Sequence, residues 1–120
     1  MTTQLSFSKI ENELLPGYRR QIGSAESTED VKKFYAYTMQ SLFRQVFAGK
    51  IEAGYDDIAL MPDQQPSFVI STGLNGKEDF ASIWNGSDLP SVVNRFTETA
   101  VKHYRHLEKN PKKTEAKIRM

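Results

Sequence analysis

The sequence predicts a two-layer α+β fold with the element order α-α-β-β-β-α, in which a three-stranded antiparallel meander packs on the long second helix and the C-terminal helix. Apolar residues recur every three to four positions over residues 28–47 and again over residues 92–107, as in amphipathic helices. Between these stretches the pattern changes to short β-branched and aromatic runs bounded by proline and glycine. A small sheet needs one face covered, and the two long helices are the natural cover.

The length and composition indicate one domain. A chain of 120 residues with 38% hydrophobic residues can bury a core without crosslinks. We expect this domain to span residues 1–109 and to be followed by a flexible basic tail over residues 110–120. The chain has no cysteine, which excludes disulfides and cysteine zinc sites. It shows no signal-peptide pattern and no apolar run of membrane-spanning length, so we expect a cytoplasmic protein without a membrane partner.

The first two predicted helices have recognisable ends. Residues 6–15 form a short amphipathic helix in which Ser8 and Glu11 have the spacing of a capping box. Pro16 is expected to stop or kink this helix, because proline has no N–H to donate. The second helix begins at Ser27 or Thr28, which can cap it, and covers residues 28–47.

The predicted sheet follows, and its last strand is ambiguous. Residues 55–61 and 67–73 are the first two strands, and the dipeptide at 75–76, Asn-Gly, is typical of a tight hairpin turn. Residues 78–84 are the third strand if they return along this hairpin, but a helical turn is the alternative for so short an apolar run. The final helix then extends to about residue 109, before Asn-Pro ends it.

The preferred function is a protein–protein interaction or regulatory module that acts as a homodimer without catalysis. The second helix carries aromatic residues around much of its circumference, more than a single sheet can cover. Uncovered apolar surface usually marks a partner interface, and a symmetric homodimer is the commonest solution. The residues expected at this interface are Phe34, Tyr37, Phe43 and Phe47. The alternative is that the first helix covers this face within the same chain.

A nucleic-acid accessory protein is the alternative function. Basic residues follow the last helix and the tail: Lys102, Arg105, Lys109, Lys112 and Lys113. Such a run can neutralise phosphates without sequence preference. A solvated helix face followed by a solubilising tail explains the same pattern and is favoured, because the isoelectric point of 7.9 is far below that of a dedicated nucleic-acid domain.

A third, less favoured function is an enzyme or small-ligand binder. Asp56 and Asp57 begin the first predicted strand, and Glu78 and Asp79 begin the third, so four carboxylates could gather at one end of the sheet. Solvated charges at strand ends are the favoured interpretation. Trp84 could line a pocket, although a lone tryptophan is more often a core residue.

Nothing in the sequence indicates a cofactor or a metal. His103 and His106 lie one helical turn apart but are the only histidines in the chain, and no third ligand completes a zinc motif. The glycine-containing loops lack the spacing of nucleotide-binding loops. We therefore expect neither a cofactor nor a metal.

Overall fold

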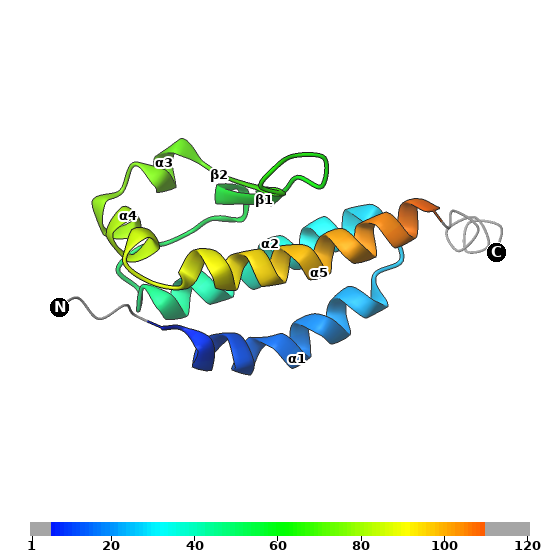
Figure 1. Cartoon of the computed structure of the whole chain (residues 1–120), viewed down its shortest axis with the longest axis horizontal. Helices are drawn as coiled ribbons and strands as arrows, with labels where there is room; N and C mark the ends of the chain where they lie inside the picture. The colour runs from blue at the N-terminus through cyan, green and yellow to red at the C-terminus, as the bar shows by residue number, and fades with distance from the viewer. Residues whose placement is uncertain (1–5, 110–120) are drawn as a thin grey trace.

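The structure is a computed structural model that describes residues 6–109 (Figure 1). In chain order the elements are α1 (Ser8–Ser24), α2 (Thr28–Val46), the 3₁₀ turn η1 (Tyr55–Asp57), β1 (Ile58–Leu60), β2 (Phe68–Ile70), α3 (Thr72–Asn75), α4 (Glu78–Asn85) and α5 (Leu89–Lys109). Over residues 6–109 the fold thus mixes helix and sheet, and the sheet has two antiparallel strands in place of the three expected. The predicted tail over residues 110–120 lies outside the described residues.

Helix α2 is the central element. It packs against α1 and α5 and also against β1, and Figure 1 shows α1 on one side of the α2–α5 pair and the hairpin with α3 and α4 on the other. Most of the apolar surface of α2 is therefore covered within the chain. The start of α2 agrees with the sequence, because the Ser27 side chain accepts a hydrogen bond from the Asp30 amide at 3.1 Å. Beyond the end of the helix, Ala48 and Gly49 adopt positive φ values of 51° and 81°.

Helix α1 is longer than the sequence predicts. It continues through Pro16 to Ser24, so the predicted stop at Pro16 is wrong. A proline inside a helix costs about 3 kcal/mol. The two turns that follow it bury Tyr18 and Ile22, and burying a large apolar side chain contributes about 1.5–3 kcal/mol. Packing of these two residues offsets the cost of the proline.

Hydrogen-bonded polar side chains join α1 and α2 to α5. The Tyr18 hydroxyl donates to the Phe96 carbonyl at 2.7 Å, and the buried Glu11 carboxylate accepts two bonds from the Arg95 guanidinium at 2.6 and 2.7 Å. Glu11 therefore serves as an ion-pair partner across helices rather than as part of the predicted capping box. The Tyr35 hydroxyl lies 2.7 Å from the Thr97 hydroxyl. These contacts, together with the apolar core around them, fix the three long helices relative to one another.

The third predicted strand is a helix. Residues predicted as a strand over 78–84 lie in α4, where Phe80 is buried and stacks on Trp84 with ring centroids 5.4 Å apart. Residues four apart lie on one face of a helix and also on one face of a strand, so the spacing of these two rings does not distinguish the two structures. The helix is favoured by tertiary packing, because the ring of Phe47 stacks on that of Phe80 with centroids 5.6 Å apart.

The predicted hairpin at residues 75–76 is also wrong. Asn75 ends the single turn α3, and Gly76 has a φ of −77°, which is ordinary helical backbone rather than the positive φ of a tight hairpin. The Ser71 side chain caps α3 by accepting a bond from the Leu74 amide at 3.1 Å, and Leu74 is buried. The cap and the buried leucine favour a helical turn over a hairpin.

Candidate interaction surface

The four aromatic residues predicted to form an interface have different environments. Phe43 and Phe47 are buried in the core, where both rings lie against Phe80. Phe34 is half-buried and packs on the same core. Tyr37 is 50% exposed. Within the described chain, Tyr37 is therefore the predicted residue that presents a large ring to the surface, and Phe43 and Phe47 support the fold.

Tyr37 is paired with a second exposed tyrosine that the sequence reasoning missed. The rings of Tyr37 and Tyr55 lie 5.3 Å apart between centroids and are inclined at 59°, and Tyr55 is 43% exposed. Tyr55 begins the turn η1, and the side chain of Gln40 on α2 holds the preceding loop by donating to the Ala53 carbonyl at 3.1 Å. The two rings limit each other's rotation, so they form one small aromatic surface, which we call the tyrosine pair.

A groove borders the tyrosine pair on the side of α1. It has a volume of about 470 Å³ and is lined by residues of both helices, among them Gly17 and Arg20 on α1 and Tyr37 and Ser41 on α2. The space beside Gly17 is open, because a Cβ atom placed there would meet none of the surrounding side chains or neighbouring elements within 4 Å. We call this feature the α1–α2 groove.

A second groove lies between α2 and the loop that follows it. It has a volume of about 530 Å³ and is lined by α2 and the loop before η1, including Gln40, Arg44 and Glu52. The two grooves together carry charges of both signs, since Glu13 and Arg20 line the first. All four charged side chains are exposed. The face that surrounds the tyrosine pair is therefore aromatic at its centre and balanced in charge at its edges.

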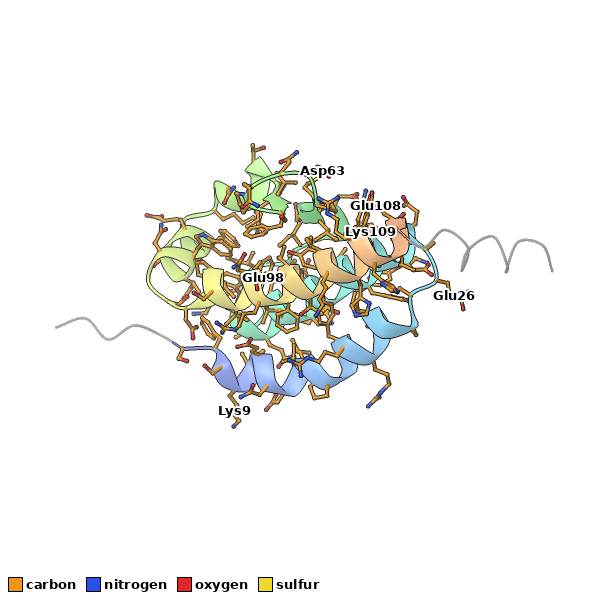
Figure 2. The ribbon with its side chains drawn as sticks, turned by 45° about the vertical axis from the view of Figure 1, so that its right-hand side comes forward. Lys9, Glu26, Asp63, Glu98, Glu108 and Lys109 are labelled. Atoms are coloured by element: carbon orange, nitrogen blue, oxygen red, sulfur yellow. The ribbon has the colours of Figure 1, made fainter. Side chains whose placement is uncertain are left out.

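Among the basic residues proposed for nucleic-acid contact, Arg105 makes contacts within the molecule. Arg105 donates to the Pro62 carbonyl at 2.7 Å and forms ion pairs with Asp63 and Glu108, both at 3.1 Å. The hydrogen bonds that Arg105 donates to these two carboxylates, that to Glu108 first, raise the pKa of Arg105. Figure 2 shows Asp63 and Glu108 near the C-terminal end of α5. Arg105 is thus engaged within the molecule.

The other basic candidates are placed differently. Lys102 and Lys109 are exposed on α5, and Lys112 and Lys113 lie outside the described residues. His103 and His106 both lie on α5 and both have interaction partners.

The four carboxylates do not gather at one end of the sheet as predicted. Asp57 has a structural role: its side chain accepts bonds from the Ser71 hydroxyl at 2.6 Å and from the Gly54 amide at 2.7 Å. These two bonds, that from Ser71 first, lower the pKa of Asp57. Asp56 is exposed in η1, and Glu78 and Asp79 lie in the first turn of α4.

No metal-binding constellation occurs among residues 6–109, where no three histidine, aspartate or glutamate side chains are placed to hold an ion. Trp84 is half-buried between Phe80 and Phe68, so it extends the core.

Strand β2 presents a further surface that the sequence reasoning missed. Val69, at its centre, is 44% exposed. A cleft of about 420 Å³ lies between α5 and the loop that precedes β2. It is lined by Pro66 and Ser67 on the side of the loop and by residues that include Glu98 and Lys102 on the side of α5. A signal for this surface is present in the sequence, since residues 64–76 contain no charged residue although 26% of the chain is charged.

Among the described residues, no helix combines the length and the apolar character needed to cross a lipid bilayer. Comparison of the chain with models of protein families, with curated proteins and with solved structures gives no match. The residues described above are therefore the basis for the functional proposal.

Proposed function

We propose that this protein is a protein–protein interaction module that acts as a homodimer, without catalysis, through the face that carries the tyrosine pair. The observation that carries the proposal is the half-exposed pair of Tyr37 and Tyr55, of which Tyr37 lines the α1–α2 groove. Tyrosine is enriched in protein interfaces because its ring supplies large contact area with few rotatable bonds, and its hydroxyl stays hydrogen-bonded when the ring is buried.

The shape of this face suits a second copy of the same chain. A two-fold symmetric interface uses one patch on both subunits, so the patch must fit itself. Here a projecting aromatic pair lies directly beside the α1–α2 groove, and Tyr37 contributes to both. In the proposed dimer, a two-fold axis lies near Tyr37 and the tyrosine of each subunit enters the groove of the other.

The charges of the face agree with self-association. Glu13 and Arg20 lie beside the α1–α2 groove, and Arg44 and Glu52 lie beside the second groove. The net charge of these four residues is zero, so two copies do not repel each other at this face. A two-fold axis can also place acidic residues of one subunit opposite basic residues of the other, which favours correct orientation.

The oligomeric state tests this proposal. Light scattering on the purified chain at about 100 μM, a concentration that detects a dimer of micromolar affinity, should give twice the chain mass of 13.7 kDa. The variant Tyr37→Glu should give the mass of a monomer, because the substitution places a charge at the centre of the interface. A central tyrosine typically contributes 2 kcal/mol or more, so Tyr37→Ala should weaken the dimer by roughly 30-fold or more.

Two glycines of α1 provide a matched pair of variants. Gly17 lines the α1–α2 groove and Gly23 does not. A Cβ atom added at either glycine would meet no side chain or neighbouring element within 4 Å. Gly17→Leu should fill the groove and weaken the dimer, whereas Gly23→Leu should leave its mass unchanged. A wild-type chain that remains a monomer at this concentration, or a dimer that tolerates both Tyr37→Glu and Gly17→Leu, would contradict the proposal.

A further inference from the structure

We infer that the outer edge of β2 and the cleft beside it bind an extended peptide of a partner protein, which adds to the hairpin as a third strand and carries a basic and an acidic side chain two residues apart. This site is separate from the tyrosine pair, so the inference does not depend on the homodimer.

The hydrogen bonds of the hairpin show which backbone groups of β2 face outward. The Met61 amide donates to the Ser67 carbonyl at 2.7 Å, and the Ser71 amide donates to the Asp57 carbonyl at 2.8 Å. Hydrogen-bonded and non-bonded pairs alternate along an antiparallel ladder. Between these two hydrogen-bonded pairs lies a third, which Val69 forms with its partner in β1.

Phe68 and Ile70, the neighbours of Val69, then direct their amide and carbonyl groups away from β1, since they form the non-bonded pairs of the register. Among the described residues, the Ile70 carbonyl is reached by the Asn75 side chain at 3.5 Å, and the amides of Phe68 and Ile70 have no backbone partner. The outer edge of β2 thus offers two amide donors and a carbonyl acceptor in the arrangement of a strand.

The sequence around this edge lacks one common protection against strand addition, a charged side chain. Edge strands of soluble proteins are commonly blocked by charged residues, above all lysine. Residues 64–76, which contain β2, have no charged residue, and Val69 exposes 44% of its surface on the outer face of the strand. An uncharged edge with an exposed valine favours the addition of an extended peptide, a common mode of peptide recognition.

The cleft between α5 and the loop that precedes β2 gives the peptide its chemistry. Glu98 and Lys102 line the cleft, one helical turn apart on α5 (Figure 2 labels Glu98). The Asn94 side chain donates to the Glu98 carboxylate at 3.0 Å and so restricts its position. Four residues of helix advance by about 6 Å and two residues of strand by about 6.6 Å. A peptide along β2 can therefore place side chains two residues apart opposite Glu98 and Lys102.

Strand β2 runs along α5 in the direction that this match requires. The loop before β2 is held near the C-terminal end of α5, where Arg105 contacts Pro62 and Asp63. After β2 the chain continues through α3 and α4 to the N-terminal end of α5. The strand and the helix are thus roughly antiparallel, and the cleft lies where the loop before β2 faces α5.

A partner peptide fits this site better than a second copy of β2. Pairing of two β2 strands would bring together residues that carry no charge, and nothing in the added strand would then meet Glu98 or Lys102. A peptide with one basic and one acidic residue satisfies both charges as well as the open edge.

The test uses the full chain and a fluorescein-labelled synthetic heptapeptide with the order Thr, Val, Arg, Val, Glu, Val, Thr. Fluorescence anisotropy at low salt should show saturable binding. Glu98→Lys should weaken this binding about tenfold, because attraction becomes repulsion at an exposed site. A second peptide, in which glutamate replaces the arginine, should bind Glu98→Lys more tightly than it binds the wild type. Glu29→Lys, an exposed change of the same charge on α2, is the control and should bind like the wild type.

Amide hydrogen exchange then locates the peptide. The amides of Phe68 and Ile70 should exchange rapidly in the free chain and become protected when the heptapeptide binds, whereas the Val69 amide should be protected in both states. Absence of saturable binding, or binding that leaves the exchange of Phe68 and Ile70 unchanged, would overturn the inference. Protection of these two amides that rises with protein concentration in the absence of peptide would also overturn it, since the edge would then pair with a second copy.

Discussion

Tyr35 and Tyr37 are separated by one residue on α2, yet they lie in opposite environments. Tyr35 is fully buried, and its hydroxyl lies 2.7 Å from Thr97 on α5. Tyr37 is 50% exposed and contacts Tyr55. Two helical residues differ by about 200° around the axis, so one ring faces α5 and the other faces away. The comparison shows that residue type alone does not distinguish a tyrosine that stabilises the fold from one that is available to a partner.

The buried tyrosines also differ from ordinary tyrosines in their ionisation. Burial raises the pKa of Tyr18 well above its usual value, and the neighbouring Tyr35 raises it further. Burial likewise raises the pKa of Tyr35, and the hydrogen bond with Thr97 offsets part of this effect. Both hydroxyl groups therefore stay protonated in the folded chain at pH values at which they would ionise in the unfolded chain.

The largest expected effect separates the buried tyrosines from the exposed pair. Tyr18→Ala removes a fully buried ring and its bond to the Phe96 carbonyl, so the free energy of unfolding should fall by about 3–5 kcal/mol, as for other large aromatic residues in cores. Urea unfolding followed by circular dichroism measures this change. A loss below about 1 kcal/mol would mean that Tyr18 does not occupy the core in solution.

The second prediction concerns alkaline pH. Above the ordinary tyrosine pKa of 10.0, the unfolded chain loses the protons of Tyr18 and Tyr35 while the folded chain keeps them. The unfolded state then binds fewer protons, so stability falls by about 1.4 kcal/mol per pH unit for each of the two. Below pH 10.0, both tyrosines are protonated in the folded and the unfolded chain, so they do not make the free energy of unfolding depend on pH.

The double variant Tyr18→Phe with Tyr35→Phe isolates this effect. Above pH 10.0, its free energy of unfolding should fall less steeply with pH than that of the wild type. The two slopes should differ by about 2.7 kcal/mol per pH unit. Urea unfolding at a series of pH values measures both slopes. Parallel curves would show that the two hydroxyl groups ionise in the folded chain and are not buried.

A smaller effect is expected from one hydroxyl group. Thr97 donates its hydroxyl proton to the Val93 carbonyl at 2.8 Å, so Tyr35 must donate to Thr97. Tyr35→Phe should therefore cost about 1 kcal/mol, the net value of a buried hydrogen bond. A double-mutant cycle with Thr97→Val measures the coupling between the two side chains. Strictly additive changes would argue against the bond.

The smallest effect on stability is expected on the exposed side. Tyr37→Ala should change the free energy of unfolding by less than about 0.5 kcal/mol, as for other surface substitutions. The free energy of unfolding should be measured at the lowest workable protein concentration, because self-association adds to apparent stability. A loss comparable to that of Tyr18→Ala would place Tyr37 in the fold rather than at an interface.

The sequence was informative about the candidate surface only in part. It indicated α2 as a helix with aromatic residues on several faces, which is correct, but it assigned Phe43 and Phe47 to the same interface as Tyr37. Both phenylalanines are covered by Phe80, a residue that the sequence placed in a strand. Tyr55 lies in a loop without periodicity, so no local pattern connects it with Tyr37. The position of these rings depends on elements distant in the chain.

By itself the sequence determined the two long helices α2 and α5, because a repeated spacing over about five turns leaves few alternatives. Only the tertiary structure decided that α1 continues through Pro16 and that α4 is a helix, since in both places packing of Tyr18, Ile22 or Phe80 outweighs a local preference. It also decided which aromatic rings remain exposed. Periodicity identifies the apolar face of an element, whereas the neighbours that cover that face are set by the packing of the whole chain.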